Sequence, residues 1–118
     1  MAESFAATLE RSDQIDNTVT GRKTGRQITI PVWFVTDGGK LYLVPVRGSD
    51  SDWYKNVLAT PHIQLTADGA SISATVTPIT DPGRVRSIVD KFRQKYGADQ
   101  VAAYYPKTDV ALEATLPR

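Results

Sequence analysis

A cationic segment bracketed by glycines is the part of this sequence best suited to bind an anion. Arg22, Lys23 and Arg26 place three positive charges within five residues, and glycines stand at positions 21 and 25. Glycine lets a backbone turn sharply, and the N–H groups exposed in such a turn can form an anion-binding nest. Arginine adds two parallel hydrogen bonds to a phosphate or carboxylate. We interpret residues 21–26 as a candidate anion-binding loop, and a solvated basic hairpin turn is the alternative.

A second candidate anion contact lies where a strand-like segment ends at Arg47 and Gly48 and a helix is predicted to begin. Helix N-termini attract anions, and in an antiparallel sheet Arg47 and the turn at 21–25 could border one groove. Arg47 could equally flank a loop and do nothing more. On the predicted helix, Asn56 is either a polar contact or a solvated residue. Trp53 and Tyr54 are more typical of an apolar stripe that faces the core.

The residue counts exclude several kinds of active site. The 118 residues include no cysteine and a single histidine, His62. Disulfides, thiolate metal sites and a cysteine nucleophile are therefore excluded, and neither a metal site nor a histidine triad is predicted. A net charge of +1, with basic residues that are not spread along one element, does not indicate a nucleic-acid partner. No transmembrane segment or signal peptide is predicted either, so we expect a cytoplasmic protein.

The elements that must position these residues are predicted to be short and closely spaced. Alternating or β-favouring composition predicts strands over residues 14–20, 28–36, 40–47, 62–67, 71–77 and 110–116. Apolar residues on both faces of 28–36 predict a strand that is buried on both sides. Brief helices are predicted over 5–12 and 98–105. Asp50 or Ser51 is expected to cap the helix that carries Trp53, Tyr54, Val57 and Leu58 on one face and stops before Pro61.

The longest predicted helix follows Asp81 and Pro82, a cap and a first-turn proline, and ends at Gly97, where a left-handed C-cap belongs. About six strands joined by hairpin-like turns, without βαβ units, favour a mainly β fold with peripheral helices. We therefore expect one domain over residues 1–118, with an antiparallel sheet curled into a barrel and helices on its outside.

An ordered succession of motifs over about residues 14 to 97 resembles the deazaflavin-dependent nitroreductase family. This family is a branch of the flavin/deazaflavin oxidoreductases related to pyridoxamine-phosphate oxidase. The motifs are TGRKTGR at 20–26, IPVWFV at 30–35, DGG at 37–39, LYLV at 41–44, Arg47-Gly48, WYKN at 53–56 and Pro61. The resemblance implies a split β-barrel of about six antiparallel strands and a reduced deazaflavin cofactor, coenzyme F-420.

The resemblance also implies roles for particular residues. The family's glycine-rich basic turn holds the cofactor's phosphate and oligoglutamate tail, and the strands after it run beside the ring. Here the cofactor-binding residues implied are Arg22, Lys23, Thr24, Gly25, Val32, Trp33, Val46, Arg47, Gly48, Trp53, Tyr54 and Asn56. Val46 stands where the family often has serine, which removes a side-chain donor. Tyr104 and Tyr105, before Pro106, resemble the aromatics that close the family's substrate side, and a buried tyrosine pair is the alternative.

The residue types suit a reaction that a cofactor carries out, because hydride transfer needs no protein nucleophile. We expect two-electron reduction of a planar, electron-poor acceptor such as a quinone, nitroaromatic or enone, with a proton from solvent, Tyr104 or Tyr105. One alternative keeps the fold and replaces the cofactor by FMN. Another is a non-catalytic protein that binds a cofactor or lipophilic ligand. The expected partner is a small-molecule redox acceptor, and the chain is expected to be a monomer or homodimer.

Overall fold

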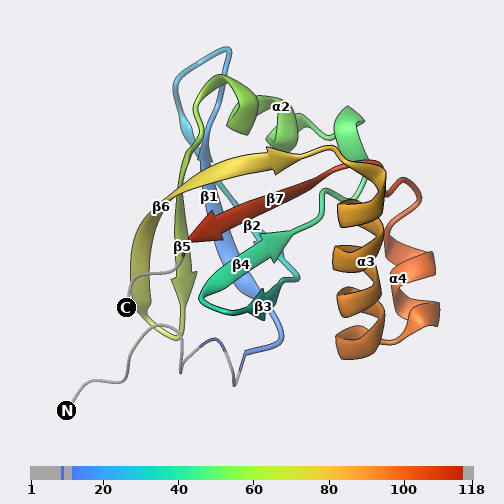
Figure 1. Ribbon diagram of the computed structural model, residues 1–118. Helices are drawn as coiled ribbons and strands as arrows, with labels where there is room; N and C mark the ends of the chain where they lie inside the picture. The colour runs from blue at the N-terminus through green and yellow to red at the C-terminus, as the bar shows by residue number, and fades with distance from the viewer. Residues whose placement is uncertain (1–8, 10–11, 116–118) are drawn as a thin grey trace.

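A computed structural model describes Leu9 and residues 12–115 of the chain. Seven strands form one antiparallel sheet in the order β2-β1-β5-β6-β7-β4-β3, and the sheet curls on itself (Figure 1). The strands are β1 (Ile15–Thr20), β2 (Gln27–Val32), β3 (Val35–Asp37), β4 (Lys40–Leu43), β5 (His62–Ala67), β6 (Ala70–Ile79) and β7 (Ala111–Thr115). The predicted helix over 5–12 lies outside the described residues, apart from Leu9 and Ser12.

Three hairpins account for most of the sheet. Residues 21–26 join β1 to β2, with Thr20 opposite Gln27, so the predicted turn between two strands is confirmed. The short turns after Asp37 and Ala67 join β3 to β4 and β5 to β6, as their glycine-containing sequences predict. β7 closes the sheet between β6 and β4. The strand predicted over 40–47 ends earlier than expected, at Leu43.

The single buried strand predicted over residues 28–36 is wrong. The chain bends at Trp33 and Phe34, so that β2 pairs with β1 at one edge of the sheet and β3 pairs with β4 at the other. β2 is not buried on both sides, since Ile28 is 40% exposed. Pro31 lacks an N–H donor and is tolerated because β2 is an edge strand. One continuous segment therefore forms both edges, and the barrel has seven strands instead of about six.

Two hydrophobic clusters lie on the two sides of the sheet. The cluster inside the barrel includes Leu41, Leu65 and Leu112. The second cluster lies under α3 (Pro82–Tyr96) and α4 (Ala98–Tyr104), which run side by side along the outside of the barrel (Figure 1). The predicted ends of α3 are confirmed, because an Asp81 carboxylate oxygen accepts a hydrogen bond from the Arg84 N–H at 2.9 Å and the helix ends at Gly97, with φ of 98°.

A short 3-10 turn, η1 (Gly48–Asp50), leads into α2 (Asp52–Ala59), which crosses one end of the barrel (Figure 1). α2 ends before Pro61, as predicted. Neither predicted cap operates, because no side chain caps the helix and the Ser51 hydroxyl accepts the Arg47 N–H at 2.9 Å instead. The predicted apolar face is also partly wrong, since Leu58 is 52% exposed. Among the described residues, no helix has the length and apolar character needed to cross a bilayer.

Candidate functional site

A cavity of about 820 Å³ opens between β2, the segment after β4, the start of α2 and the end of α4. Its walls are mostly apolar and aromatic, and its polar groups gather where α2 begins. The lining residues are Gln14, Ile28, Ile30, Pro31, Val32, Trp33, Val44, Val46, Arg47, Asp50, Ser51, Asp52, Trp53, Asn56, Tyr104 and Tyr105. This size and this division into apolar walls and a few convergent polar groups are typical of small-molecule sites.

The cavity brings together many of the residues predicted from the sequence. Those that line it are Val32, Trp33, Val46, Arg47, Trp53, Asn56, Tyr104 and Tyr105. Those that do not are Arg22, Lys23, Thr24, Gly25, Gly48 and Tyr54. Tyr54 packs into the barrel core, so its position gives no support to a cofactor contact. Sequence reasoning missed Ile28 and Ile30, although their alternation with Val32 places all three on one face of β2.

Trp33 forms the aromatic end of the cavity and is held from behind by α3. Its ring stacks on that of Tyr96, with centroids 4.2 Å apart and planes at 8°, and Tyr104 meets it edge-on at 5.3 Å. The Tyr96 hydroxyl accepts the Phe34 N–H at 3.1 Å and lies 2.7 Å from the carbonyl oxygen of Asp13, to which it donates. Burial raises the pKa of Tyr96 to about 12. Tyr96 therefore fixes the bend between β2 and β3 as well as the cavity wall.

Lys95 supports the same bend. Its ammonium donates to the carbonyl oxygen of Phe34 at 3.0 Å and lies 3.5 Å from the centre of the Phe34 ring. Burial lowers the pKa of Lys95. The sequence predicts the helix that carries Lys95 and Tyr96, but nothing in the local sequence indicates that these two side chains hold a bend more than sixty residues earlier.

Tyr104 and Tyr105, which the sequence presented as equivalent candidate proton donors, differ in their surroundings. Tyr104 is 56% exposed at the rim, whereas Tyr105 is 7% exposed and packs between Trp33 and Phe92. Burial, and to a lesser degree the neighbouring Tyr96, raises the pKa of Tyr105. Within residues 12–115, the Tyr105 hydroxyl has no hydrogen-bond partner, although the side chain lines the cavity. Tyr105 thus keeps its proton at neutral pH, and its hydroxyl donates to no acceptor within the described residues.

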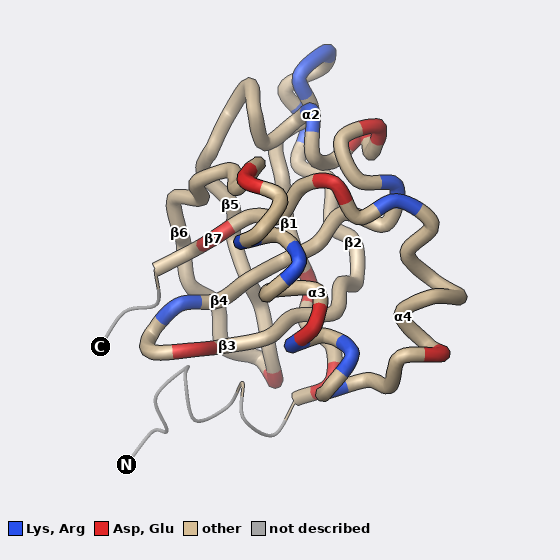
Figure 2. The backbone as a smooth tube through the Cα atoms, turned by 45° about the vertical axis from the view of Figure 1, so that its right-hand side comes forward, with Lys and Arg blue, Asp and Glu red and all other residues tan. Residues whose placement is uncertain are grey.

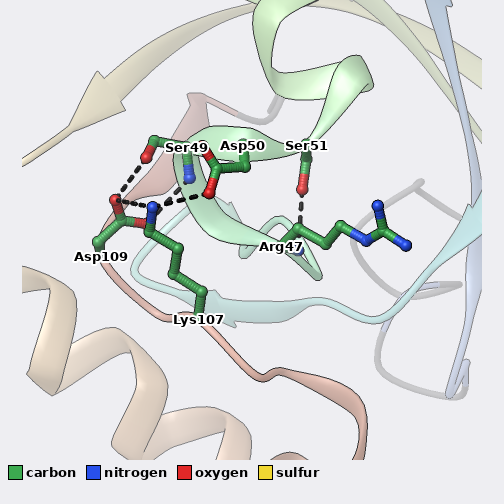
Figure 3. A network of polar contacts seen from close by, with 6 residues as sticks. All are labelled: Arg47, Ser49, Asp50, Ser51, Lys107 and Asp109. Carbon is green, nitrogen blue, oxygen red and sulfur yellow. Dashed lines mark hydrogen bonds and ion pairs between the residues drawn. The ribbon is translucent and has the colours of Figure 1, made fainter.

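The loop that carries Arg47 is anchored to the segment before β7 (Figure 3). The Ser49 N–H and hydroxyl donate to the Asp109 carboxylate at 2.9 and 2.6 Å, and the Lys107 ammonium donates to Asp50 at 2.9 Å. Burial opposes ionisation of Asp109, but the Ser49 hydrogen bonds and Lys107 outweigh it, so the pKa of Asp109 is lowered. Gly48 must be glycine here, because its φ is +57° and a β-carbon would overlap Asp109 Oδ1.

This anchored loop leaves the Arg47 side chain available to a ligand. In Figure 3 its guanidinium extends away from the Ser49–Asp109 and Lys107–Asp50 contacts. It forms no ion pair with any of the described residues, and it lines the cavity. Arg47 therefore places a positive charge at the polar end of the cavity, with no ion-pair partner among the described residues.

The basic turn lies against α2 beside this polar end, and Figure 2 shows Lys and Arg at its tip. Arg22 binds α2 directly: its backbone N–H and Nη1 donate to Asn56 Oδ1 at 3.1 and 2.7 Å. Nη1 also donates to the carbonyl oxygen of Asp52 at 3.2 Å, and Nη2 lies 3.5 Å from the Asp52 carboxylate. Lys23 and Arg26 are exposed and form no ion pair within the described part of the chain. The predicted groove bordered by both Arg47 and the turn is not seen, because no residue of 21–26 lines the cavity; Asn56, which contacts Arg22, does line it.

Solved structures share this architecture of a curled antiparallel sheet with helices on its outside, which defines a split β-barrel of the pyridoxamine-phosphate oxidase type. They include an F-420-H2-dependent reductase, FDR-A, with a TM-score of 0.67, 24% identity and coverage of 86% of this chain and 93% of that chain. A Listeria innocua protein described as a pyridoxamine 5'-phosphate oxidase matches with a TM-score of 0.69 and 14% identity, and the match covers 96% of this chain and 90% of that chain. HutZ, the haem storage protein from Vibrio cholerae, matches with a TM-score of 0.71 and 9% identity, and the match covers 96% of this chain and 87% of that chain.

The predicted fold class is confirmed by these likenesses, and the resemblance to deazaflavin-dependent reductases holds at the level of the fold. The chain belongs to the family described as "Uncharacterized protein conserved in bacteria (DUF2255)", whose model matches residues 7–116.

Proposed function

We propose that the cavity binds reduced coenzyme F-420 and that the chain transfers a hydride from it to a planar, electron-poor acceptor such as a quinone, nitroaromatic or enone. The observation that carries the proposal is the arrangement of the cavity. An apolar and aromatic slot ends at Arg47, which forms no ion pair within the described part of the chain, and the basic turn stands next to it. A planar ring with an anionic arm needs both parts in this order, since apolar walls bind the ring and cations bind the arm.

The residues present fit such a coenzyme. Val32, Trp33 and Val46 would hold the ring between β2 and the segment after β4. Arg47 would bind the phosphate, and the exposed Lys23 and Arg26 would follow the acidic tail outside the cavity. When bound, the reduced deazaflavin supplies the hydride, while the protein orients the two reactants and keeps water from the reacting atoms.

Tyr105 is the residue we assign as proton donor to the reduced acceptor. It is buried, protonated at neutral pH and free to donate from the cavity wall, whereas the exposed Tyr104 competes with water. We expect Tyr105→Phe to lower kcat by about a hundredfold with little change in coenzyme affinity, because general acids contribute on that scale. Tyr104→Phe is the matched control and should change kcat only slightly. Equal effects of the two substitutions would contradict the assignment.

Titration of the purified chain with coenzyme F-420, FMN and FAD in parallel tests the cofactor. We expect F-420 to bind most tightly, and Arg47→Ala to weaken that binding about tenfold to a hundredfold, since a hydrogen bond to a charged group contributes about 1.5–3 kcal/mol. Lys91→Ala, which removes a cation on α3 that pairs with Asp37, is the control for net charge. Unchanged affinity in Arg47→Ala would refute the proposed anion site.

FMN is the second candidate cofactor, supported by the likeness to the Listeria innocua protein. FMN absorbs at longer wavelength than a deazaflavin, so the absorbance spectrum of the purified protein distinguishes them. The likeness to a haem storage protein supports a non-catalytic binding function instead. Against haem, the single histidine, His62, lies outside the cavity on β5, with Nδ1 3.1 Å from the Thr75 hydroxyl. Tight coenzyme binding without turnover across a panel of acceptors would favour storage.

A further inference from the structure

Arg22 fixes the orientation of the Asn56 side-chain amide. Both Arg22 groups that meet this amide are donors: the backbone N–H at 3.1 Å and the guanidinium Nη1 at 2.7 Å. A guanidinium and a backbone N–H accept no hydrogen bond, so the amide atom between them must be the oxygen. The nitrogen, Nδ2, therefore points away from Arg22 with both of its N–H groups.

The Nδ2 group has no partner in the described part of the protein. Asn56 is only 5% exposed, and what remains open of it lines the cavity. No described backbone or side-chain group accepts a hydrogen bond from Nδ2, while Oδ1 accepts two. The fully buried side-chain atoms without a partner among the described residues are the two of Asn17, so Asn56 Nδ2 is a donor that opens to the cavity. A ligand in the cavity is the partner that the position of Asn56 makes available.

We infer that Asn56 presents two fixed N–H donors to the cavity and that these bind an acceptor oxygen of the ligand. Arg22 then acts as a positioning residue for Asn56 and not as a phosphate ligand, because its guanidinium is already committed to Asn56 and to Asp52. The acceptor that best suits two N–H donors is an oxygen with two free lone pairs, such as a ring carbonyl or a phosphate oxygen. This inference rests on the proposed function for the identity of the ligand, but not for the orientation of the amide.

Asn56→Asp is the decisive substitution, because it changes the two ends of the side chain in opposite ways. The carboxylate still accepts from Arg22, now as a charge-assisted pair, so the melting temperature should stay the same or rise. At the cavity end an acceptor replaces the N–H donors. We expect the affinity for coenzyme F-420 to fall by at least about tenfold, the scale of one lost hydrogen bond.

A double-mutant cycle separates positioning from direct contact. Arg22→Met releases the Asn56 amide, so it should weaken coenzyme binding in the wild-type background and have little effect in the Asn56→Asp background. Equal loss in both backgrounds would show that Arg22 contacts the ligand itself, which would overturn the positioning role. Lys23→Met, a loss of charge at the neighbouring position without a contact to Asn56, is the matched control and should be additive.

A phosphate-free deazaflavin nucleoside and inorganic pyrophosphate distinguish the two sources of the acceptor oxygen. Loss of affinity for the nucleoside in Asn56→Asp indicates a ring carbonyl, and this neutral probe also controls for the added negative charge. Loss for pyrophosphate alone indicates a phosphate oxygen. Full affinity of Asn56→Asp for all three ligands would overturn the inference.

The orientation of the amide can be tested without any ligand. In NMR spectra of the free protein, the Asn56 side-chain N–H protons should show stronger contacts to cavity-lining residues such as Trp53 than to the Arg22 guanidinium. The reverse pattern would refute the orientation. If the wild-type chain binds no deazaflavin, the proposed function fails, and the NMR result still decides the orientation.

Discussion

Gly48 offers the sharpest test of how the loop bearing Arg47 is held. Its φ of +57° costs an L-residue about 1–2 kcal/mol, since the β-carbon then crowds the backbone. Gly38, in the β3–β4 turn, has almost the same φ, +58°, and a β-carbon there meets nothing within 4 Å. Gly38→Ala therefore measures the conformational cost alone. Gly48→Ala adds the overlap with Asp109 Oδ1 and the loss of the contacts that Asp109 makes.

The extra cost at position 48 follows from the hydrogen bonds that the overlap breaks. Two donors from Ser49 reach the Asp109 carboxylate, at 2.9 and 2.6 Å. Hydrogen bonds to a charged group contribute about 1.5–3 kcal/mol, but the Asp109 side chain is 40% exposed, so we take about 1 kcal/mol for each. Gly48→Ala should then lower the free energy of unfolding by about 3–4 kcal/mol, against about 1–2 kcal/mol for Gly38→Ala.

Equilibrium urea denaturation of the two variants measures this difference of about 2 kcal/mol. Gly48→Ala should also weaken coenzyme binding, because displacement of the loop moves Arg47, while Gly38→Ala should leave binding unchanged. If the two variants lose the same stability, the anchor between η1 and the segment before β7 contributes nothing and the reasoning is wrong.

Three other predictions follow from buried or hydrogen-bonded polar groups. The lowered pKa of Asp109 means that its stabilisation is present above the unfolded pKa, near 3.8, and is lost as pH falls through the folded value, so Asp109→Asn should flatten the acid limb of a stability–pH curve. Burial raises the pKa of Tyr96 from 10.0 to about 12, so the contribution of Tyr96 to the free energy of unfolding is fully present below pH 10 and is lost as the pH rises to about 12. Tyr96→Phe should remove a late-titrating phenol from the absorbance titration at 295 nm. Asn17 is fully buried in the barrel, and neither of its side-chain polar atoms has a partner among the residues that the structure describes, so Asn17→Leu, of similar shape, should raise the free energy of unfolding by about 1–3 kcal/mol in urea. A loss of stability instead would show that an internal water binds Asn17.

Local signals predicted the parts of the fold that local interactions decide. The β5–β6 hairpin follows from Asp68 and Gly69 between two alternating runs, and α3 follows from Asp81, Pro82 and Gly97. The division of residues 28–36 could not be predicted in the same way, because the alternation of apolar residues continues through the bend. The cause of the bend is distant, since Tyr96 and Lys95 hold its backbone from α3.

The candidate site was predictable where residue type carries the chemistry. Arg47, Trp33 and Asn56 line the cavity, as their types and their resemblance to the family's motifs indicate. The partner of each charge was not predictable, because it comes from elsewhere in the chain. The Ser51 hydroxyl accepts the Arg47 N–H and therefore does not cap α2. Arg22, chosen as a phosphate ligand from its position in the turn, is bound to Asn56, which lies 34 residues later.

The bend at Trp33 and Phe34 has a consequence for the order in which the molecule assembles. Its backbone is held by Tyr96, 62 residues later in the chain, so the bend gains this hydrogen bond only once α3 has docked, although β2 and β3 pair within local hairpins. Contacts between such distant residues form late in folding because closing the loop between them costs entropy. We therefore expect the bend in the cavity wall to order late, and mild denaturant to release a bound ligand while the β5–β6 hairpin still resists hydrogen exchange.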